Sequence, residues 1–328
     1  MSAFNIFYFP NFARGGIERN FQIWYKTAMS VSDGVLVVSE RKPPICRPKN
    51  YAENNVFSIL RAMNNVNASG LINLIVFRGV LKPLLLKLVL RIFLGYKVKL
   101  IYRANNDPLH WYHERSVKRL VAEIIKVLFL QFYNLIIFNS RELASRCLHY
   151  NSRQMIINNP VSYNKKIHFN TYNDAKFLFV GRKSKQKNIA NLIKSFEILG
   201  EKFSLDVVGI EKPATVEYKN IRFLGWQEKI DYSNYTHFIL PSLYEGSPNA
   251  LLEGLNNGLV PVTTPFKSGG MEILEAFKMQ KFVSKNFSSN EIIKTVEDSV
   301  KENISLYRDT PIDYRQEVFQ EKLHELFK

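Results

Sequence analysis

Residues 240–258, LPSLYEGSPNALLEGLNNG, run from the end of an apolar segment through a polar turn into an amphipathic segment. Pro248 stands where a helix can start, because the first helical position does not use the backbone N–H that proline lacks. The pattern predicts a strand ending near residue 240, then a loop, then a helix over residues 248–257. Repeats of this unit build parallel sheets covered by helices.

The predicted helix has two different faces. Asn249, Glu253 and Asn257 recur at four-residue spacing and therefore share one side, which makes the Glu253 carboxylate available to a ligand. A solvated surface carboxylate is the alternative interpretation, and it is the common one for a helical glutamate. The apolar stripe that we expect to face the core consists of Leu251, Leu252, Leu255 and Leu259.

The start of this helix is a candidate anion site. Backbone N–H groups at the positive end of a helix dipole can hold a phosphate without a cationic side chain, although such a helix can also simply cap itself. Glu245 lies in the turn, where a carboxylate can orient sugar hydroxyls. The N–H groups that we expect to face an anion belong to Gly246, Ser247, Asn249 and Ala250.

Short apolar runs alternate with amphipathic stretches along the whole chain, which predicts an α/β fold with parallel sheets. We find no repeat period and no low-complexity tract. In the first half the predicted strands are residues 4–9, 34–39, 74–77, 99–102, 135–139 and 155–157. The predicted helices there are residues 18–30, 82–94, 114–132 and 141–149.

Residues 158–174 are polar, contain Pro160 and show no sustained periodicity, so we expect them to link two domains. Two doubly wound halves that face each other place a ligand cleft between them. In the second half the predicted strands are residues 177–181, 205–209, 221–224, 238–240, 260–263 and 282–284. The predicted helices there are residues 189–199, 248–257 and 290–303.

The composition is that of a globular protein. A chain of 328 residues has room for two domains of roughly 100 to 200 residues each. With 46% hydrophobic and 23% charged residues, it is not a disordered, collagenous or coiled-coil chain. Cys46 and Cys147 are too few for a disulfide framework and lack metal-ligand spacing, which predicts a reducing, cytoplasmic setting.

The chain is strongly basic. Its 45 lysines and arginines exceed its 29 acidic residues by 16. This surplus predicts an anionic partner, which can be a nucleic acid, an acidic membrane surface or a phosphorylated small molecule.

Two segments bear on membranes. The N-terminal residues lack the basic region of a signal peptide and predict a buried strand, and the most apolar run, residues 127–138, is shorter than the ~20 residues of a spanning helix. Residues 80–97 interleave lysine and arginine with leucine, isoleucine and phenylalanine. This segment predicts either a helix in a membrane interface or a core helix whose lysines reach water.

Residues 245–253 resemble the motif of the family-4 retaining nucleotide-sugar glycosyltransferases of GT-B fold. That motif is two glutamates separated by seven residues in a Glu-Gly-x-Pro-Asn setting, and here they are Glu245 and Glu253. The resemblance is good over about residues 176–275 and also includes Gly15-Gly16 followed by Glu18. The other similar segments are NNPV (158–161), FLFVGRKSKQKNIANLIKSFEIL (177–199), FLGW (223–226) and GLVPVTT (258–264).

The resemblance implies roles for individual residues. Arg182 and Lys187 clamp the donor diphosphate, and such cations stabilise the charge that develops on the leaving group. Glu253 binds the ribose hydroxyls and Glu245 touches the transferred sugar. A solvated charge cluster in this lysine-rich loop is the alternative for the two cations.

No metal ion and no cofactor are expected, because the chain has no Asp-x-Asp to hold a divalent ion. The nucleotide sugar itself is a co-substrate. Gly15 and Gly16 approach the donor in the resembled family, although they can also form an ordinary turn. The donor-binding residues that the resemblance implies are Gly15, Gly16, Arg182, Lys187, Gly246, Ser247, Pro248, Asn249, Ala250 and Glu253.

The sequence departs from the family at the end of the fourth strand, where a histidine often contacts the sugar. Here residues 100–111 read LIYRANNDPLHW. We expect Asn105 to take this role, with Asn106 and Arg103 as alternatives. Retention of the anomeric configuration, by front-side substitution, is likewise implied by the family alone.

The resulting prediction is a GT-B enzyme with an acceptor-side domain at residues 1–165 and a donor domain at residues 166–305. Residues 306–328 are expected to form a helix that packs on the first domain. We expect transfer of a hexosyl or N-acetylhexosaminyl group from a nucleotide diphosphate sugar, with uridine as the expected base. The expected acceptor is a glycan or a polyprenyl-diphosphate-linked glycan of bacterial surface polysaccharide, such as O-antigen, capsule or lipopolysaccharide. We expect peripheral attachment to the inner face of the cell membrane and no nucleic acid partner.

Three other functions are compatible with parts of the sequence. A hydrolase could use Glu245 and Glu253 as its carboxylate pair, but it leaves Arg182 and Lys187 without a role. A nucleic-acid-binding protein would need a basic stripe with interleaved aromatic residues. A sugar-nucleotide-binding subunit without activity is favoured only by the missing histidine.

Overall fold

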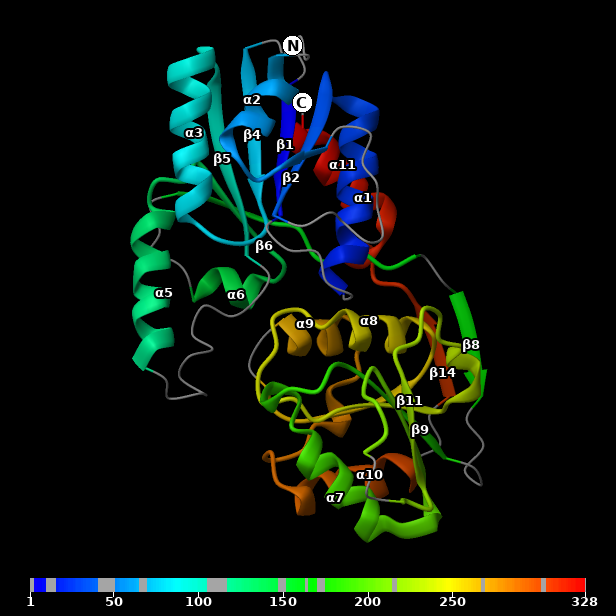
Figure 1. Cartoon of the computed structure of the whole chain (residues 1–328). Helices are drawn as coiled ribbons and strands as arrows, with labels where there is room; N and C mark the ends of the chain where they lie inside the picture. Colours follow the sequence, from blue (N-terminus) through cyan, green and yellow to red (C-terminus); the bar gives the residue numbers. More distant parts are fainter. Residues whose placement is uncertain are drawn as a thin grey trace. The chain divides into compact units, whose positions relative to one another are not determined.

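The computed structural model describes residues 3–9, 16–40, 51–64, 70–104, 117–146, 152–162, 165–169, 175–213, 217–266, 269–301 and 305–327. The chain divides into two compact units (Figure 1). The first unit comprises Met1–Pro160 and Gln316–Lys328, and the second unit comprises Val161–Arg315.

The first unit is built on a parallel sheet of seven strands in the order β3-β2-β1-β4-β5-β6-β7. Strand β1 lies inside the sheet, and all five of its residues are buried, as expected for a strand covered on both faces. The strands are β1 (Phe4–Tyr8), β2 (Gly34–Ser39), β3 (Tyr51–Glu53), β4 (Leu71–Val76), β5 (Lys97–Ala104), β6 (Leu135–Phe138) and β7 (Arg153–Ile156).

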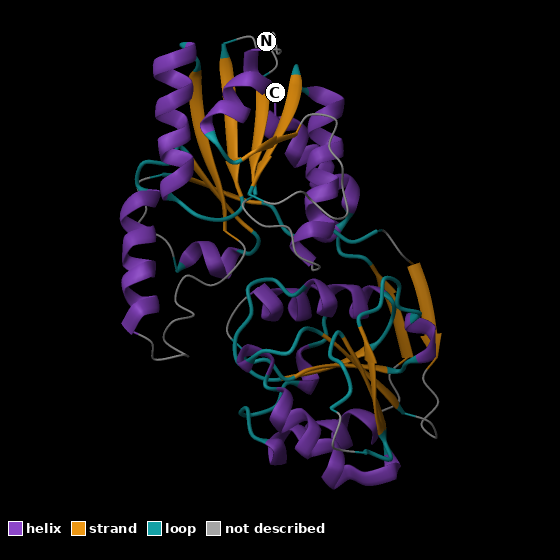
Figure 2. Cartoon of the chain, viewed as in Figure 1, coloured by secondary structure: helices purple, strands orange, loops and turns teal. Residues whose placement is uncertain are grey.

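Helices cover both faces of this sheet (Figure 2). Ile6 and Tyr8 of β1 face a core shared with α2, α3, α5 and α6, whereas Phe7 between them faces a core shared with α1 and α11. The helices are α1 (Gly16–Val31), α2 (Val56–Asn64), α3 (Leu81–Leu94), α5 (Val117–Leu130), α6 (Arg141–Ser145) and α11 (Gln316–Phe327).

The C-terminal helix α11 packs on α1. The rings of Trp24 and Phe319 lie 6.0 Å apart between centroids, and those of Phe7 and Phe327 lie 5.9 Å apart, edge to face. Buried aromatic pairs of this geometry stabilise a core beyond their buried area. The last twelve residues of the described chain therefore belong to the core of the first unit.

The second unit has a parallel sheet of five strands in the order β11-β10-β9-β12-β13 and a separate antiparallel pair, β14-β8. The strands are β8 (Lys165–Phe169), β9 (Lys176–Val180), β10 (Ser204–Val208), β11 (Ile221–Gly225), β12 (His237–Leu240), β13 (Val260–Thr263) and β14 (Ser305–Asp309). The helices are α7 (Ile189–Leu199), α8 (Asn249–Asn256), α9 (Gly269–Ala276) and α10 (Ser289–Lys301).

Helices α7 and α8 cover opposite faces of the five-stranded sheet. Phe177 of β9 packs edge to face on Phe196 of α7. Phe238, one position further along the paired strand β12, faces α8, where a methyl group on Gly254 would lie 2.8 Å from its ring. Residues 241–248 join β12 directly to α8, so the start of the helix follows the carboxyl end of that strand.

Both crossings between the two units lie side by side. Val161 and Arg315 form a parallel β-bridge, and the Val161 N–H donates to the Tyr314 carbonyl at 2.8 Å. The boundaries therefore fall at residues 160/161 and 315/316, whereas the sequence placed them after residues 165 and 305. The reason is that β8 and β14 pair with each other inside the second unit.

The predicted α/β fold with two Rossmann-like parallel sheets is confirmed. Three local predictions differ from the structure. Residues 158–174 contain β8, so this segment is more than a linker. Residues 305–309 are a strand and not part of a helical tail. Residues 282–284 make a single bridge, Thr263 with Val283, after a short 3-10 helix.

Candidate functional site

The strand order of the second unit reverses between β9 and β12, which are neighbours in the sheet. Ligands of open α/β sheets bind outside the carboxyl ends of the strands at such a switch point. The residues after β9 are GRKSKQK (181–187), and those after β12 are PSLYEGSP (241–248). The fold therefore brings the two segments singled out in the sequence to one edge of this sheet.

The two segments are held together by their backbones. The Leu243 N–H donates to the Gln186 carbonyl at 2.8 Å, and the Gln186 side-chain amide donates to the Tyr244 carbonyl at 2.8 Å. The Thr264 hydroxyl, from the segment after β13, donates to the Ser242 carbonyl. These bonds fix the loop that carries Glu245.

Lys187 and Glu245 form a largely buried ion pair. The Lys187 Nζ lies 2.6 Å from the Glu245 Oε1, and the two side chains are 14% and 8% exposed. The Ser242 hydroxyl donates to the same oxygen at 2.6 Å, and the Gln186 amide reaches Oε2 at 3.4 Å. One cation and two neutral donors therefore meet the hydrogen-bonding needs of this buried carboxylate.

The short 3-10 helix Lys185–Lys187 turns Lys187 toward Glu245. It ends at Asn188, whose φ of 53° lies in the left-handed region, which asparagine tolerates better than most residues. The Asn188 amide donates to the Phe287 carbonyl at 3.1 Å and so anchors this turn. Arg182, the second predicted cation of the site, is exposed. Lys183 is exposed as well, whereas the Lys187 side chain is largely buried.

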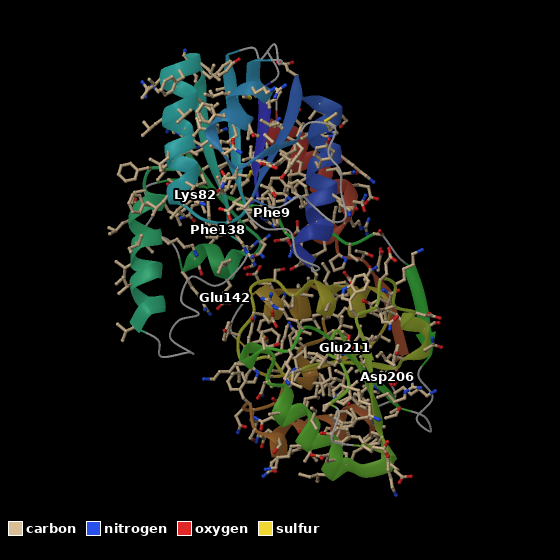
Figure 3. The ribbon with its side chains drawn as sticks, viewed as in Figure 1. Phe9, Lys82, Phe138, Glu142, Asp206 and Glu211 are labelled. Carbon is tan, nitrogen blue, oxygen red and sulfur yellow. The ribbon has the colours of Figure 1, made fainter. Side chains whose placement is uncertain are left out.

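Three glycines end three adjacent strands, and we call them the glycine shelf: Gly181, Gly209 and Gly225. The Gly181 N–H donates to the Val208 carbonyl at 3.0 Å, and the Gly209 N–H donates to the Gly225 carbonyl at 2.6 Å. A methyl group on Gly209 would lie 2.7 Å from the Gly181 carbonyl oxygen. The Glu211 carboxylate, labelled in Figure 3, lies against Gly225, 2.8 Å from where a methyl group would stand. The missing side chains of these glycines therefore let the strand ends and their neighbours pack closely.

Helix α8 begins one residue later than the sequence predicted. Pro248 has an extended conformation with ψ of 107°, and the helix starts at Asn249. The first backbone bond of the helix runs from the Leu252 N–H to the Pro248 carbonyl at 3.2 Å. The N–H groups before Leu252 therefore lie at the positive end of the helix, outside its internal bonding.

The two faces of α8 are as predicted. Glu253 and Asn257 are half-buried on one side. The buried stripe on the other side consists of Leu251, Leu252 and Leu255, and Leu259, which follows the helix, is buried as well; each is at most 1% exposed.

Glu253 has a partner that the sequence did not reveal. The Tyr232 hydroxyl donates to the Glu253 Oε2 at 2.7 Å. Tyr232 opens the short 3-10 helix Tyr232–Asn234, which Asp231 caps by accepting from the Ser233 N–H at 3.1 Å. The sequence DYS signals this cap, but no local pattern indicates that the tyrosine reaches α8.

The candidate residues of the first unit are only partly within the described chain. Gly16 is the first residue of α1, while Gly15, Asn105 and Asn106 lie outside the described residues. Their roles remain predictions.

Arg103, the third alternative for the sugar contact, is buried at the end of β5. Its guanidinium donates to the Phe138 and Ile157 carbonyls at 3.1 and 2.8 Å and to the Asn159 Oδ1 at 3.0 Å. It also lies 5.6 Å from the centroid of the Trp24 ring. Burial lowers the pKa of Arg103 to about 9, so the group is charged at neutral pH and ties strand ends together.

Within the described parts of the chain, no three histidine, cysteine, aspartate or glutamate side chains gather as a metal ion would require. The helices of those parts include none with the length and apolar character that crossing a bilayer demands.

Residues 163–316, which lie almost entirely within the second unit, match the family model described as glycosyl transferases group 1. The chain is similar to the uncharacterized glycosyltransferase MJ1059 of Methanocaldococcus jannaschii, with 26% identity over 207 residues. The match covers 54% of this chain and 50% of the relative, so it spans about half the length of that protein.

Two solved structures are similar over almost the whole chain. Alr3699/HepE of Anabaena, in complex with UDP and glucose, has a TM-score of 0.73 at 14% identity and covers 98% of both chains. WaaG, a glycosyltransferase involved in lipopolysaccharide biosynthesis, has a TM-score of 0.73 at 14% identity and covers 99% of both chains. These similarities establish the GT-B fold that the sequence predicted.

Proposed function

We propose that this protein is a retaining glycosyltransferase that moves a sugar from a nucleoside diphosphate sugar to a glycan or lipid-linked acceptor. The observation that carries the proposal is the Lys187–Glu245 contact of 2.6 Å beside the start of α8 and the glycine shelf. One cation and a helix start suit a diphosphate. The adjacent carboxylate suits the hydroxyls of the sugar attached to it.

In this proposal Lys187, Arg182 and the first N–H groups of α8 bind the diphosphate and stabilise the charge that it gains as it leaves. Glu245 accepts hydrogen bonds from the sugar, and Glu253 accepts them from the ribose. The acceptor oxygen bonds to the anomeric carbon on the face from which the diphosphate departs. The acceptor proton passes to the departing phosphate oxygen, so no covalent enzyme intermediate and no metal ion are needed.

Uridine is the base that we propose for the donor. A structural neighbour that binds UDP supports this choice. The neighbour WaaG, with its role in lipopolysaccharide biosynthesis, supports a bacterial surface polysaccharide as the product.

The direct test is a thermal-shift screen of the full chain against UDP, GDP, ADP and their sugar conjugates. A ligand present at about 100 times its Kd stabilises the folded state by about 2.7 kcal/mol, so we expect a selective rise of several degrees with one nucleotide. The exposed variant Lys183→Ala should respond like the original protein. The proposal fails if none of the nucleotides raises the melting temperature.

We also propose that an anionic membrane is a partner, through the outer faces of α3 and α5. Only Pro83, Leu86 and Leu90 of α3 are buried, so a narrow stripe of this helix packs against the core. Figure 1 shows α3 and α5 on the same side of the first unit, and both contribute to the same core. The apolar side chains that they expose are Leu81, Leu85, Leu88, Ile92 and Phe93 of α3 and Val117, Val121, Ile124, Ile125 and Leu128 of α5.

The positive charge of α3 favours an anionic lipid surface as the partner of these exposed apolar faces. Helix α3 contains Lys82, Lys87 and Arg91 and has no acidic residue (LKPLLLKLVLRIFL). An apolar face with basic residues binds the interface of anionic lipids. A lipid-linked acceptor would be reached from such a position, which is why we place the protein at the inner face of the cell membrane.

Vesicle flotation tests the membrane proposal. We expect the protein to float with phosphatidylglycerol vesicles and much less with phosphatidylcholine vesicles. Replacing the exposed Leu85 and Ile92 by glutamate should reduce flotation at least about tenfold, because each buried apolar side chain contributes about 1.5–3 kcal/mol. The matched control Ile198→Glu changes an equally exposed residue of α7 and should float normally. Equal flotation of all variants would show that these faces do not bind lipid.

A further inference from the structure

The hydrogen bond between Tyr232 and Glu253 joins two elements that are far apart in the sequence. Tyr232 belongs to the short 3-10 helix that follows β11, and Glu253 belongs to α8. The oxygen–oxygen distance of 2.7 Å is that of a strong bond between a hydroxyl and a carboxylate. The bond therefore ties the Glu253 side chain to the segment that precedes β12.

A glutamate side chain on a helix surface normally samples several rotamers, and binding a ligand then requires one of them to be selected. Tyr232 removes much of this freedom, because its ring is half-buried against the core of the second unit and its hydroxyl donates to the Glu253 Oε2. The carboxylate is thus oriented before any ligand arrives.

We infer that Tyr232 is a positioning residue that sets the preference of the site for a ribose over a deoxyribose. This inference rests on the proposed function, in which Glu253 accepts hydrogen bonds from the ribose hydroxyls. An oriented carboxylate discriminates strongly between a sugar that offers a hydroxyl and one that does not, because the geometry of the accepted bond is fixed in advance.

The experiment compares the Kd values of UDP and 2′-deoxy-UDP, measured by calorimetry on the full chain. For the original protein we expect UDP to bind about 10 to 100 times more tightly. Tyr232→Phe should lower this ratio about fivefold or more, mainly by weakening UDP, while the Kd of 2′-deoxy-UDP stays almost unchanged. Glu253→Gln should lower the ratio at least as far.

Tyr235→Phe is the matched control. The Tyr235 hydroxyl donates to the Asp206 Oδ2 at 2.9 Å. Tyr235→Phe therefore also removes a hydrogen bond between a tyrosine and a carboxylate, but it leaves the bond to Glu253 in place. This variant should keep the original ratio. Melting temperatures without nucleotide show whether each variant is folded.

The outcomes separate the inference from the proposed function. If the original protein binds no nucleoside diphosphate, the proposed function fails. If it binds UDP but Tyr232→Phe keeps the original ratio, the inference alone is wrong. If Tyr232→Phe weakens both nucleotides equally, the tyrosine has only a structural role, and the inference is again wrong.

Discussion

Replacing Lys187 with alanine is expected to destabilise the protein by about 3 kcal/mol, because removing one partner of a buried ion pair leaves an uncompensated charge. Glu245 is only 8% exposed at its side chain, so water cannot replace the lost cation. The same variant should transfer sugar at least about 100 times more slowly, since a positioned donor at the leaving group contributes about 2.7–4 kcal/mol to the transition state. Chemical denaturation and initial rates of transfer measure the two effects separately.

A double variant distinguishes folding from catalysis. Lys187→Met with Glu245→Gln removes both charges and keeps both side-chain volumes, so much of the lost stability should return. Transfer should remain slow, because neither charge is present to act on the donor. The exposed Lys183→Ala should change the free energy of unfolding by no more than about 0.5 kcal/mol. Normal transfer by Lys187→Ala would contradict the assigned role of this lysine.

Replacing Gly209 with alanine is expected to have the second large effect, on both stability and nucleotide binding. Gly209 has φ of +90°, and an added methyl group would lie 2.7 Å from the Gly181 carbonyl oxygen. Backbone atoms of neighbouring strands cannot move aside as a flexible side chain can. We expect a loss of at least about 3 kcal/mol, from the strained backbone and the displacement of β9.

Gly95→Ala is the control for this substitution. Gly95 also has a positive φ, of 70°, but a methyl group there would meet nothing within 4 Å. Strain alone should therefore cost about 1 kcal/mol. Melting curves with and without the nucleotide that the protein binds measure both effects. Similar losses for the two variants would mean that the glycine shelf does not need its close packing.

The sequence predicts those parts of the site that depend on neighbours in the chain. The leucine stripe of α8 and the side occupied by Glu253 follow from helical periodicity, and both have the expected burial. The strand β9 and the turn that holds Lys187 are predicted because an apolar run of residues is followed directly by a polar run. These features are encoded within about ten residues each, where the periodicity of side chains is a direct signal.

The features that the sequence does not predict depend on distant residues. Strand β8 pairs with β14 across the whole second unit, and neither strand alone has a clear alternating pattern. The Tyr232–Glu253 bond joins two helices across a sequence separation of 21 residues. The close approach of Gly209 to Gly181 depends in the same way on how β9 and β10 pair.

The bridge between Val161 and Arg315 closes the second unit as a single insertion in the chain of the first unit. One uninterrupted stretch of the polypeptide forms the whole unit, and the two ends of that stretch meet at a single pair of backbone positions. Recombination at these two points would exchange the second unit as a whole. The reading frame of the first unit, including α11 and its aromatic contacts with α1, is then restored on the far side of the insert.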